Sequence, residues 1–134
     1  MNIDGECHCG KITFSAEVDP EQVIICHCTD CQTLSGSVYR TVAPAIAGTF
    51  NMLTGDPKIY VKTAENGSKR AQAFCSDCGT PIYSAPVGEG STFFGIRVGA
   101  LKQRDQLIPK KQIWCRSAQT WAQDINNMSK VETQ

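Results

Sequence analysis

Seven of the eight cysteines fall into three short clusters, and this clustering constrains the fold more than any other feature of the chain. The clusters are Cys7-His8-Cys9, Cys26-His27-Cys28-Thr29-Asp30-Cys31 and Cys75-Ser76-Asp77-Cys78. Zinc in proteins is almost always four-coordinate; a structural site takes four protein ligands, whereas a catalytic site takes three and keeps one position open. Seven thiols divide naturally into four and three. The pattern therefore predicts one closed zinc site and one open zinc site.

The length and charge of the chain narrow the partners that it can have. The chain has 134 residues, with 13 basic and 13 acidic residues and a formal net charge of zero. It lacks the basic excess that is typical of proteins that bind nucleic acid or anionic membranes. No apolar run is long enough for a membrane-spanning helix. We therefore expect no nucleic-acid and no membrane partner, a single zinc-binding domain over residues 1–125 and a flexible tail over residues 126–134.

The first residues bear on the redox state of the cysteines. The segment 1–6 has neither a basic start nor an apolar stretch, so we expect no secretory signal and a cytoplasmic protein. Thiols stay reduced in the cytosol, which favours metal ligands over disulfides. Iron–sulfur clusters are also held by cysteines, but the chain lacks the closely spaced runs of ferredoxins, and zinc is the better interpretation.

Short segments of alternating apolar and polar residues, separated by eleven glycines and six prolines, indicate a mainly β fold. Strands at this spacing are typical of antiparallel sheets. Residues 65–68 are expected to form a hairpin loop. Little helix is expected: one turn over residues 29–34 with Thr29 as its N-cap, and a short helix over residues 117–127. The predicted strands are 11–17, 38–42, 59–62, 70–74, 81–83 and 92–98.

Two cysteine pairs that lie far apart in the sequence have the spacing of metal-binding turns, or zinc knuckles. Each pair, Cys7 with Cys9 and Cys75 with Cys78, is followed directly by a glycine, which tolerates the left-handed conformation that such turns need. In extended backbone, residues i and i+2 point to one side, so both thiols of the first pair can reach one ion. The four thiols are predicted to hold one structural zinc.

The middle cluster is different, because Cys26, Cys28 and Cys31 lie within six residues and can bind one ion without a distant partner. We interpret it as a second zinc with an open position, which can accept water or a substrate thiol and is lost more readily than the closed zinc. The alternative is that Cys115 or a histidine closes the site. Cys115 stands alone, as a small buried apolar residue commonly does.

Four other side chains are candidates for a supporting role around the metals. The alternation that points the thiols at a metal turns His8 and His27 away from it, towards solvent or towards the groups around the ligands. Zinc with three thiolates is already anionic, and a fourth thiolate would need cations nearby. Arg40 and Arg97 lie in predicted strands and could supply them, although charged residues are mostly solvated at the surface.

The chain resembles the glutathione-dependent formaldehyde-activating enzyme family, which also includes centromere protein V-like zinc proteins. The resemblance extends from Gly5 to Trp121 and depends on the order and spacing of all seven clustered cysteines. The motifs that carry it are Gly5-x-Cys7-x-Cys9-Gly10, Cys26-x-Cys28-x-x-Cys31, Phe74-Cys75-x-x-Cys78-Gly79-x-Pro81, Arg97-Val98-Gly99-Ala100-Leu101, Pro109 and Ile113-Trp114-x-x-Ser117-x-x-x-Trp121.

The resemblance implies a β-tent fold with two zincs per chain. It also implies that the two paired clusters hold the structural zinc and that the middle cluster holds the catalytic one. The family's named activity is the condensation of formaldehyde with glutathione to S-hydroxymethylglutathione, classed as a carbon–sulfur lyase. One wall of the substrate site is expected at residues 33–37, just after the third ligand.

The leading hypothesis is therefore a zinc-dependent carbon–sulfur lyase that acts on the adduct of a thiol such as glutathione with a small aldehyde such as formaldehyde. In this hypothesis Cys26, Cys28 and Cys31 carry the catalytic zinc. One alternative is a non-catalytic zinc-stapled binding module, and another is a redox-sensitive zinc–thiolate protein. The exposed edges of a β fold would permit either a monomer or a homodimer.

Overall fold

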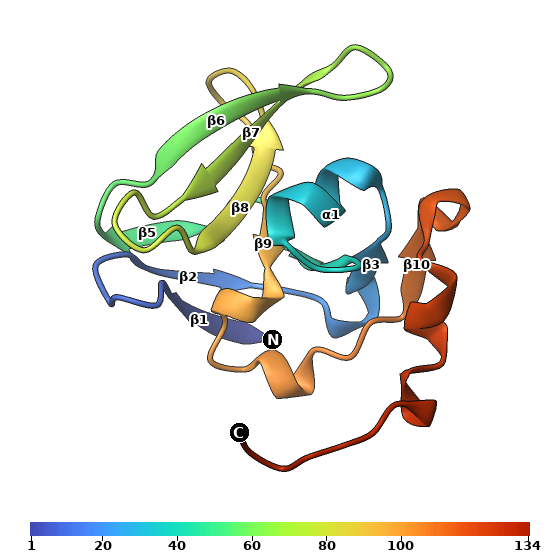
Figure 1. Ribbon diagram of the computed structural model, residues 1–134. Helices are drawn as coiled ribbons and strands as arrows, with labels where there is room; N and C mark the ends of the chain where they lie inside the picture. The colour runs from blue at the N-terminus through green and yellow to red at the C-terminus, as the bar shows by residue number, and fades with distance from the viewer.

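Two β-sheets and one short helix make up the computed structural model, which describes residues 1–134 (Figure 1). This arrangement confirms the prediction of a mainly β fold with little helix. The single α-helix is α1 (Thr29–Ser35), and the remaining helical segments are short 3-10 turns. The strands are β1 (Asn2–Glu6), β2 (Thr13–Glu17), β3 (Ile24–Cys26), β4 (Arg40–Pro44), β5 (Asn51–Thr54), β6 (Lys58–Thr63), β7 (Lys69–Phe74), β8 (Pro81–Pro86), β9 (Gly95–Arg97) and β10 (Lys111–Ile113).

The strands form one small sheet, β1-β2-β5, and one large sheet in the order β10-β3-β4-β9-β8-β7-β6. In Figure 1 the small sheet lies beneath β6, β7 and β8, and α1 lies beside β9. Neighbouring strands are antiparallel, except that β10 pairs with β3 in parallel. This exception to the expected antiparallel arrangement arises because β10 comes from the distant C-terminal part of the chain, so that no hairpin turn fixes its direction.

Most of the predicted strands are present, and the differences have local causes. The predicted segments 11–17, 59–62, 70–74 and 81–83 overlap β2, β6, β7 and β8. The segment 92–98 is extended only at Gly95–Arg97, because the chain turns into a 3-10 helix at Val98–Ala100. The helix expected at 117–127 is wrong. That region forms separate 3-10 turns at Cys115–Ser117, Thr120–Gln123 and Ile125–Asn127.

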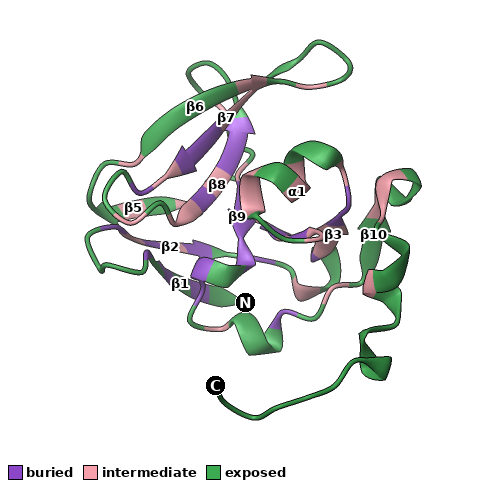
Figure 2. Ribbon diagram, in the orientation of Figure 1, coloured by how far each residue is buried: buried purple, intermediate pink, exposed green.

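The hydrophobic core lies between the two sheets and includes two of the clustered cysteines. Phe14 is completely buried, and Cys7 and Cys75 are each only 2% exposed within the same apolar cluster. Figure 2 shows the buried segments on β7, β8 and β9, whereas the edge strand β6 and the C-terminal segment are exposed. No helix has the length and apolarity that crossing a membrane requires. The fold thus places the group that contains Cys7 and Cys75 at the core, whereas the middle group begins at Cys26 in the large sheet.

Candidate metal centres

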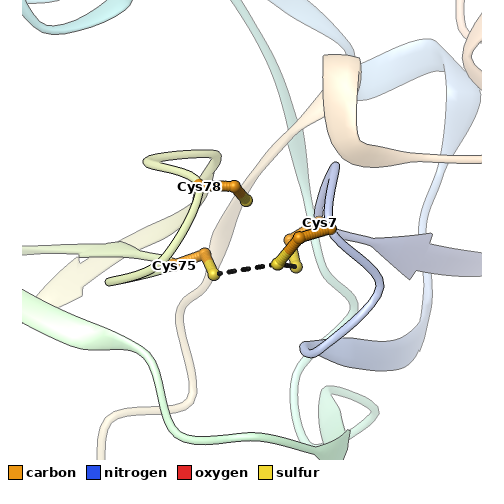
Figure 3. Close-up of side chains that lie close together, drawn as sticks. Cys7, Cys75 and Cys78 are labelled. Atoms are coloured by element: carbon orange, nitrogen blue, oxygen red, sulfur yellow. Dashed lines mark hydrogen bonds between the residues drawn. The ribbon is translucent and has the colours of Figure 1, made fainter.

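Cys7, Cys9, Cys75 and Cys78 are brought together by two turns, one after β1 and one after β7. Their four sulfur atoms lie within 4.8 Å of one another. The Sγ atoms of Cys7 and Cys9 are 3.5 Å apart, and those of Cys9 and Cys75 are 3.7 Å apart. Figure 3 shows Cys75 and Cys78 on their turn, facing Cys7. Four sulfurs at about 2.3 Å from a tetrahedral zinc are separated by about 3.8 Å, so this group fits such an ion.

Both turns are closed by backbone hydrogen bonds that end at a glycine. The N–H of Gly10 donates to the carbonyl of Cys7 at 2.9 Å, and the N–H of Gly79 donates to the carbonyl of Cys75 at 2.8 Å. Gly10 has φ of 79° and Gly79 has φ of 75°. This left-handed backbone is costly for residues that have a Cβ atom. The sequence therefore specifies the two cysteine turns locally, before any metal binds.

Contacts outside the sulfur atoms hold the two turns against each other. The N–H of His8 donates to Oγ1 of Thr80 at 3.0 Å, and the same hydroxyl lies 3.2 Å from Sγ of Cys78. Hydrogen bonds from the Thr80 hydroxyl and, next, from the Thr80 backbone lower the pKa of Cys78 to about 5. Lys11 and Asp77 form an exposed ion pair between the same turns. The four-cysteine group is thus supported by contacts of its own.

Cys26, Cys28 and Cys31 form the second group, again with all sulfur atoms within 4.8 Å of one another. Cys26 is the last residue of β3, and Cys31 lies in the first turn of α1. The N-cap of α1 is Cys28 rather than the predicted Thr29, and its Sγ accepts the N–H of Cys31 at 3.3 Å. A strand end and a helix start therefore fix all three thiols within one short segment.

The thiols of the second group have different pKa values when no metal is bound. A hydrogen bond from Cys31 lowers the pKa of Cys26, and the same contact, together with burial, raises the pKa of Cys31. Cys26 is therefore the first of the three to ionise. Metal ligation requires thiolates, so binding an ion here must displace protons from the other two cysteines.

Neither metal group includes Cys115 or a histidine nitrogen. Cys115 is exposed rather than buried, because it lies in a 3-10 turn at the surface. His8 is exposed. His27 is buried, its Nε2 lies 2.7 Å from Oε1 of Gln112, and its Nδ1 has no hydrogen-bond partner. Of the residues expected to form a wall at 33–37, Leu34 lines the neighbouring cavity.

A cavity of about 370 Å³ adjoins the three-cysteine group and lies on one face of the large sheet. Strand register explains which side chains lie on this face of the sheet, because residues directly opposite each other share a face. Cys26 is opposite Arg40, Val42 is opposite Arg97, and Ser84 is opposite both Gln72 and Gly95. Since side chains alternate along each strand, these residues all face the same side. The sheet thus presents a cysteine and several polar groups to one space.

Two arginines are buried on this face without a carboxylate partner. Arg40 is 6% exposed and Arg97 is 7% exposed. Both donate to Oε1 of Gln72, Arg97 from Nη2 at 2.7 Å and Arg40 from Nη1 at 3.4 Å. Burial lowers the pKa of Arg97 to about 9, and the nearby charge of Arg40 contributes in the same direction. Arg97 still carries its charge at neutral pH. The expectation that these arginines are close to the middle cysteines is met, whereas the solvated alternative is wrong.

Sequence reasoning missed Arg70, Gln72 and Ser84, which also line the cavity. They lie on one face of β7 and β8, and neighbouring positions such as Ala73 and Tyr83 pack at the core on the other face. A polar side chain at every second position of a strand also occurs on solvated sheets. Only the register to β9 shows that these polar residues face a cavity beside the cysteines.

Comparison with known proteins places this geometry in a family. The sequence profile of the glutathione-dependent formaldehyde-activating enzyme (GFA) family matches residues 2–117. No curated protein sequence matches the chain. The crystal structure of a Rhodobacter sphaeroides protein, a structural genomics target, is similar with a TM-score of 0.60 and 19% identity, covering 84% of this chain and 99% of that one. This likeness concerns the fold. Because the profile spans most of the chain and both cysteine groups, the protein belongs to the glutathione-dependent formaldehyde-activating enzyme family.

Proposed function

We propose that this protein is a zinc-dependent enzyme of the carbon–sulfur lyase type, which interconverts a thiol and a small aldehyde with their S-hydroxyalkyl adduct. The observation that carries the proposal is the three-cysteine group beside a cavity that the buried side chain of Arg97 lines. Family membership suggests glutathione as the thiol and formaldehyde as the aldehyde. A binding module without catalysis would have no need for an incomplete ligand set at the wall of a cavity.

The numbers of ligands in the two cysteine groups indicate different roles for the zinc ions that they would hold. Cys7, Cys9, Cys75 and Cys78 would hold a structural zinc, and the sulfur separations of this group support that assignment. The group of three would hold the second zinc. When bound there, the ion supplies an open position at which a substrate thiol is held as its thiolate. Soft sulfur ligands favour zinc over harder oxygen-preferring ions such as magnesium.

The reaction itself is balanced without an oxidant or a reductant. In the synthetic direction the thiol sulfur forms a bond to the carbonyl carbon, the C=O bond becomes C–OH, and the proton that leaves the thiol ends on that oxygen. The reverse direction breaks the same C–S bond. This addition is intrinsically easy, so the protein mainly has to bring the two reactants together in one cavity.

The chain's own residues contribute charge and confinement. Arg40 is opposite Cys26 in the sheet, and its guanidinium stabilises negative charge on the thiolates. Leu34 and Phe93 contribute apolar surface to the cavity, and apolar surface helps to exclude water from a bound thiol. A positive charge in a poorly hydrated site acts more strongly than the same charge in water.

Exchange kinetics provide the test. In a mixture of formaldehyde and glutathione, two-dimensional exchange NMR measures how fast free thiol and S-hydroxymethyl adduct interconvert at equilibrium. We expect the zinc-loaded protein to raise that rate, and the Cys28→Ser variant to leave it at the uncatalysed value. If the exchange rate is the same with protein, with the variant and with buffer alone, the protein is not this enzyme. A non-catalytic module would then be the better description.

A further inference from the structure

The cavity beside the three cysteines contains more positive charge than the protein itself neutralises. The two acidic side chains that line the cavity already form ion pairs with cations of the chain. Asp30 pairs with Lys62 at 2.6 Å, and both carboxylate oxygens of Glu65 accept from Arg116, at 2.8 and 2.9 Å. No other aspartate or glutamate lines the cavity. The arginines that line it therefore have no acidic partner.

Arg97 is the buried member of this unpaired set. Its guanidinium makes one hydrogen bond, from Nη2 to the neutral side chain of Gln72. A guanidinium has five N–H donors, and a buried charge without a carboxylate partner is expensive. The side chain is held in place by β9 on a face where no carboxylate of the chain reaches it, and its anionic neighbours are the thiolates of the metal group. These features are typical of a group that awaits an anion.

Arg70 is the second member, nearer the rim. It has no ion pair and no side-chain hydrogen bond, and its guanidinium lies over the ring of Phe93, 5.2 Å from the centroid. Its direct neighbour across β6 and β7 is another cation, Lys62. Like charges at opposite positions of a sheet destabilise each other. Asp30 already pairs with Lys62, so Arg70 is the one cation of this pair that no carboxylate of the chain offsets.

Charge balance with the metal leaves both arginines free. A zinc ion with three thiolates has one net negative charge, and Arg40 is placed opposite Cys26 to offset it. Arg40 does not line this cavity; it lines a second cavity of about 380 Å³ behind the wall made by Gln72, Leu34 and Arg97. A substrate thiolate then offsets one of the two remaining positive charges. One further negative charge completes the balance.

We propose that the substrate thiol of this site carries a carboxylate on the same molecule, and that Arg97 and Arg70 bind that carboxylate. The proposal rests on the proposed function, because it takes the sulfur of the same ligand to occupy the open metal position. The cavity volume of about 370 Å³ is near the lower limit for ligand pockets. The thiol and the carboxylate are therefore close together in a small molecule or at one end of a short peptide.

The test uses the protein loaded with cobalt, whose absorption bands report the sulfur ligands. Binding of 3-mercaptopropionate is compared with binding of 3-mercaptopropionamide, which has the same thiol but no charge. We expect the carboxylate to bind about tenfold to a hundredfold more tightly, as a charge-assisted pair gives. The Cys28→Ser variant controls for spectral changes at the four-cysteine group. The thiol groups of the two compounds have different pKa values, which alone could change their affinities. The decisive quantity is therefore the affinity for 3-mercaptopropionate divided by that for 3-mercaptopropionamide, compared between the wild type and each variant.

Three variants separate this proposal from simpler explanations. Arg70→Gln removes one charge at the rim, where folding is least affected. Gln72→Glu keeps the side-chain shape and gives Arg97 a carboxylate from the protein itself. Each should reduce the affinity ratio about tenfold or more, whereas Lys58→Gln, which removes a charge outside the cavity, should leave the ratio unchanged.

The possible results are distinct for the two proposals. If both thiols change the cobalt spectrum with equal affinity, or if the ratio survives both Arg70→Gln and Gln72→Glu, the carboxylate site is refuted while the open metal position stands. If neither thiol changes the spectrum of the wild-type protein, the open position is refuted as well. The proposal is supported if the affinity ratio is above about ten in the wild type and falls about tenfold or more in both Arg70→Gln and Gln72→Glu.

Discussion

Cys75 and Cys28 each belong to a candidate metal group, but they differ in what else they hold together. Cys75 is 2% exposed and packs within the hydrophobic core, whereas Cys28 is only partly buried and lies outside that core at the start of α1. We predict that Cys75→Ser destabilises the domain severely and that Cys28→Ser does not. Serine is also a good N-cap residue, so the second substitution preserves the start of the helix.

The expected difference in stability between the two variants follows from the folding free energy that a structural zinc contributes. Structural zinc contributes about 10–16 kcal/mol to the folding of zinc-finger peptides. An equal division among four thiolates gives about 2.5–4 kcal/mol for Cys75 as a lower limit. The whole stability of a domain is about 5–15 kcal/mol. A domain of this size loses about 3–5 °C of its melting temperature per kcal/mol, so Cys75→Ser should lower the melting temperature by about 8–20 °C.

The assay measures two quantities on each purified protein: zinc per chain by elemental analysis, and the melting temperature by circular dichroism. The wild type should contain two zincs. Cys28→Ser should contain one and melt within about 5 °C of the wild type. Equal destabilisation by the two substitutions would contradict this prediction, because it would mean that both groups hold structural metals.

Three smaller predictions follow from individual contacts and from ligand counts. A mild chelator should remove one zinc per chain before the other, as followed by a colorimetric zinc indicator, and bound thiol should slow that first loss. Thr80→Val should destabilise the domain by about 1–2 kcal/mol in urea unfolding, since His8 and Cys78 both contact its hydroxyl, whereas Thr80→Ser should not; equal effects would point to lost packing instead. Because Trp114 lines the cavity, thiol binding should change the fluorescence of a Trp121→Phe variant but not that of Trp114→Phe.

The sequence predicted the parts of the fold that depend on neighbouring residues. The two cysteine turns are examples, because the spacing of each pair and the glycine after it determine the local backbone. Alternating residues likewise predicted β6 and β7, which form a hairpin with local pairing. The seven clustered cysteines could be divided into groups of four and three for the same reason, and the structure brings them together in those groups.

The parts that were missed depend on residues far apart in the chain. Nothing near Lys111–Ile113 indicates that this strand pairs in parallel with β3, almost ninety positions earlier. The roles of Arg70 and Gln72 were missed because their neighbourhood is set by β9 and α1. Cys115 was expected to be buried on the base rate for its residue type alone, and a surface turn overrides that preference.

Cys26 and Arg40 are held opposite each other by the pairing of β3 with β4. The middle cysteine group and the guanidinium opposite it therefore share one ladder of backbone hydrogen bonds, and a slip of one residue between β3 and β4 would turn Cys26 and Arg40 to opposite faces of the sheet. Exposed ion pairs, such as Arg116 with Glu65, weaken as salt is added, whereas buried charges are screened much less. The site thus keeps its electrostatic character over a wide range of ionic strength.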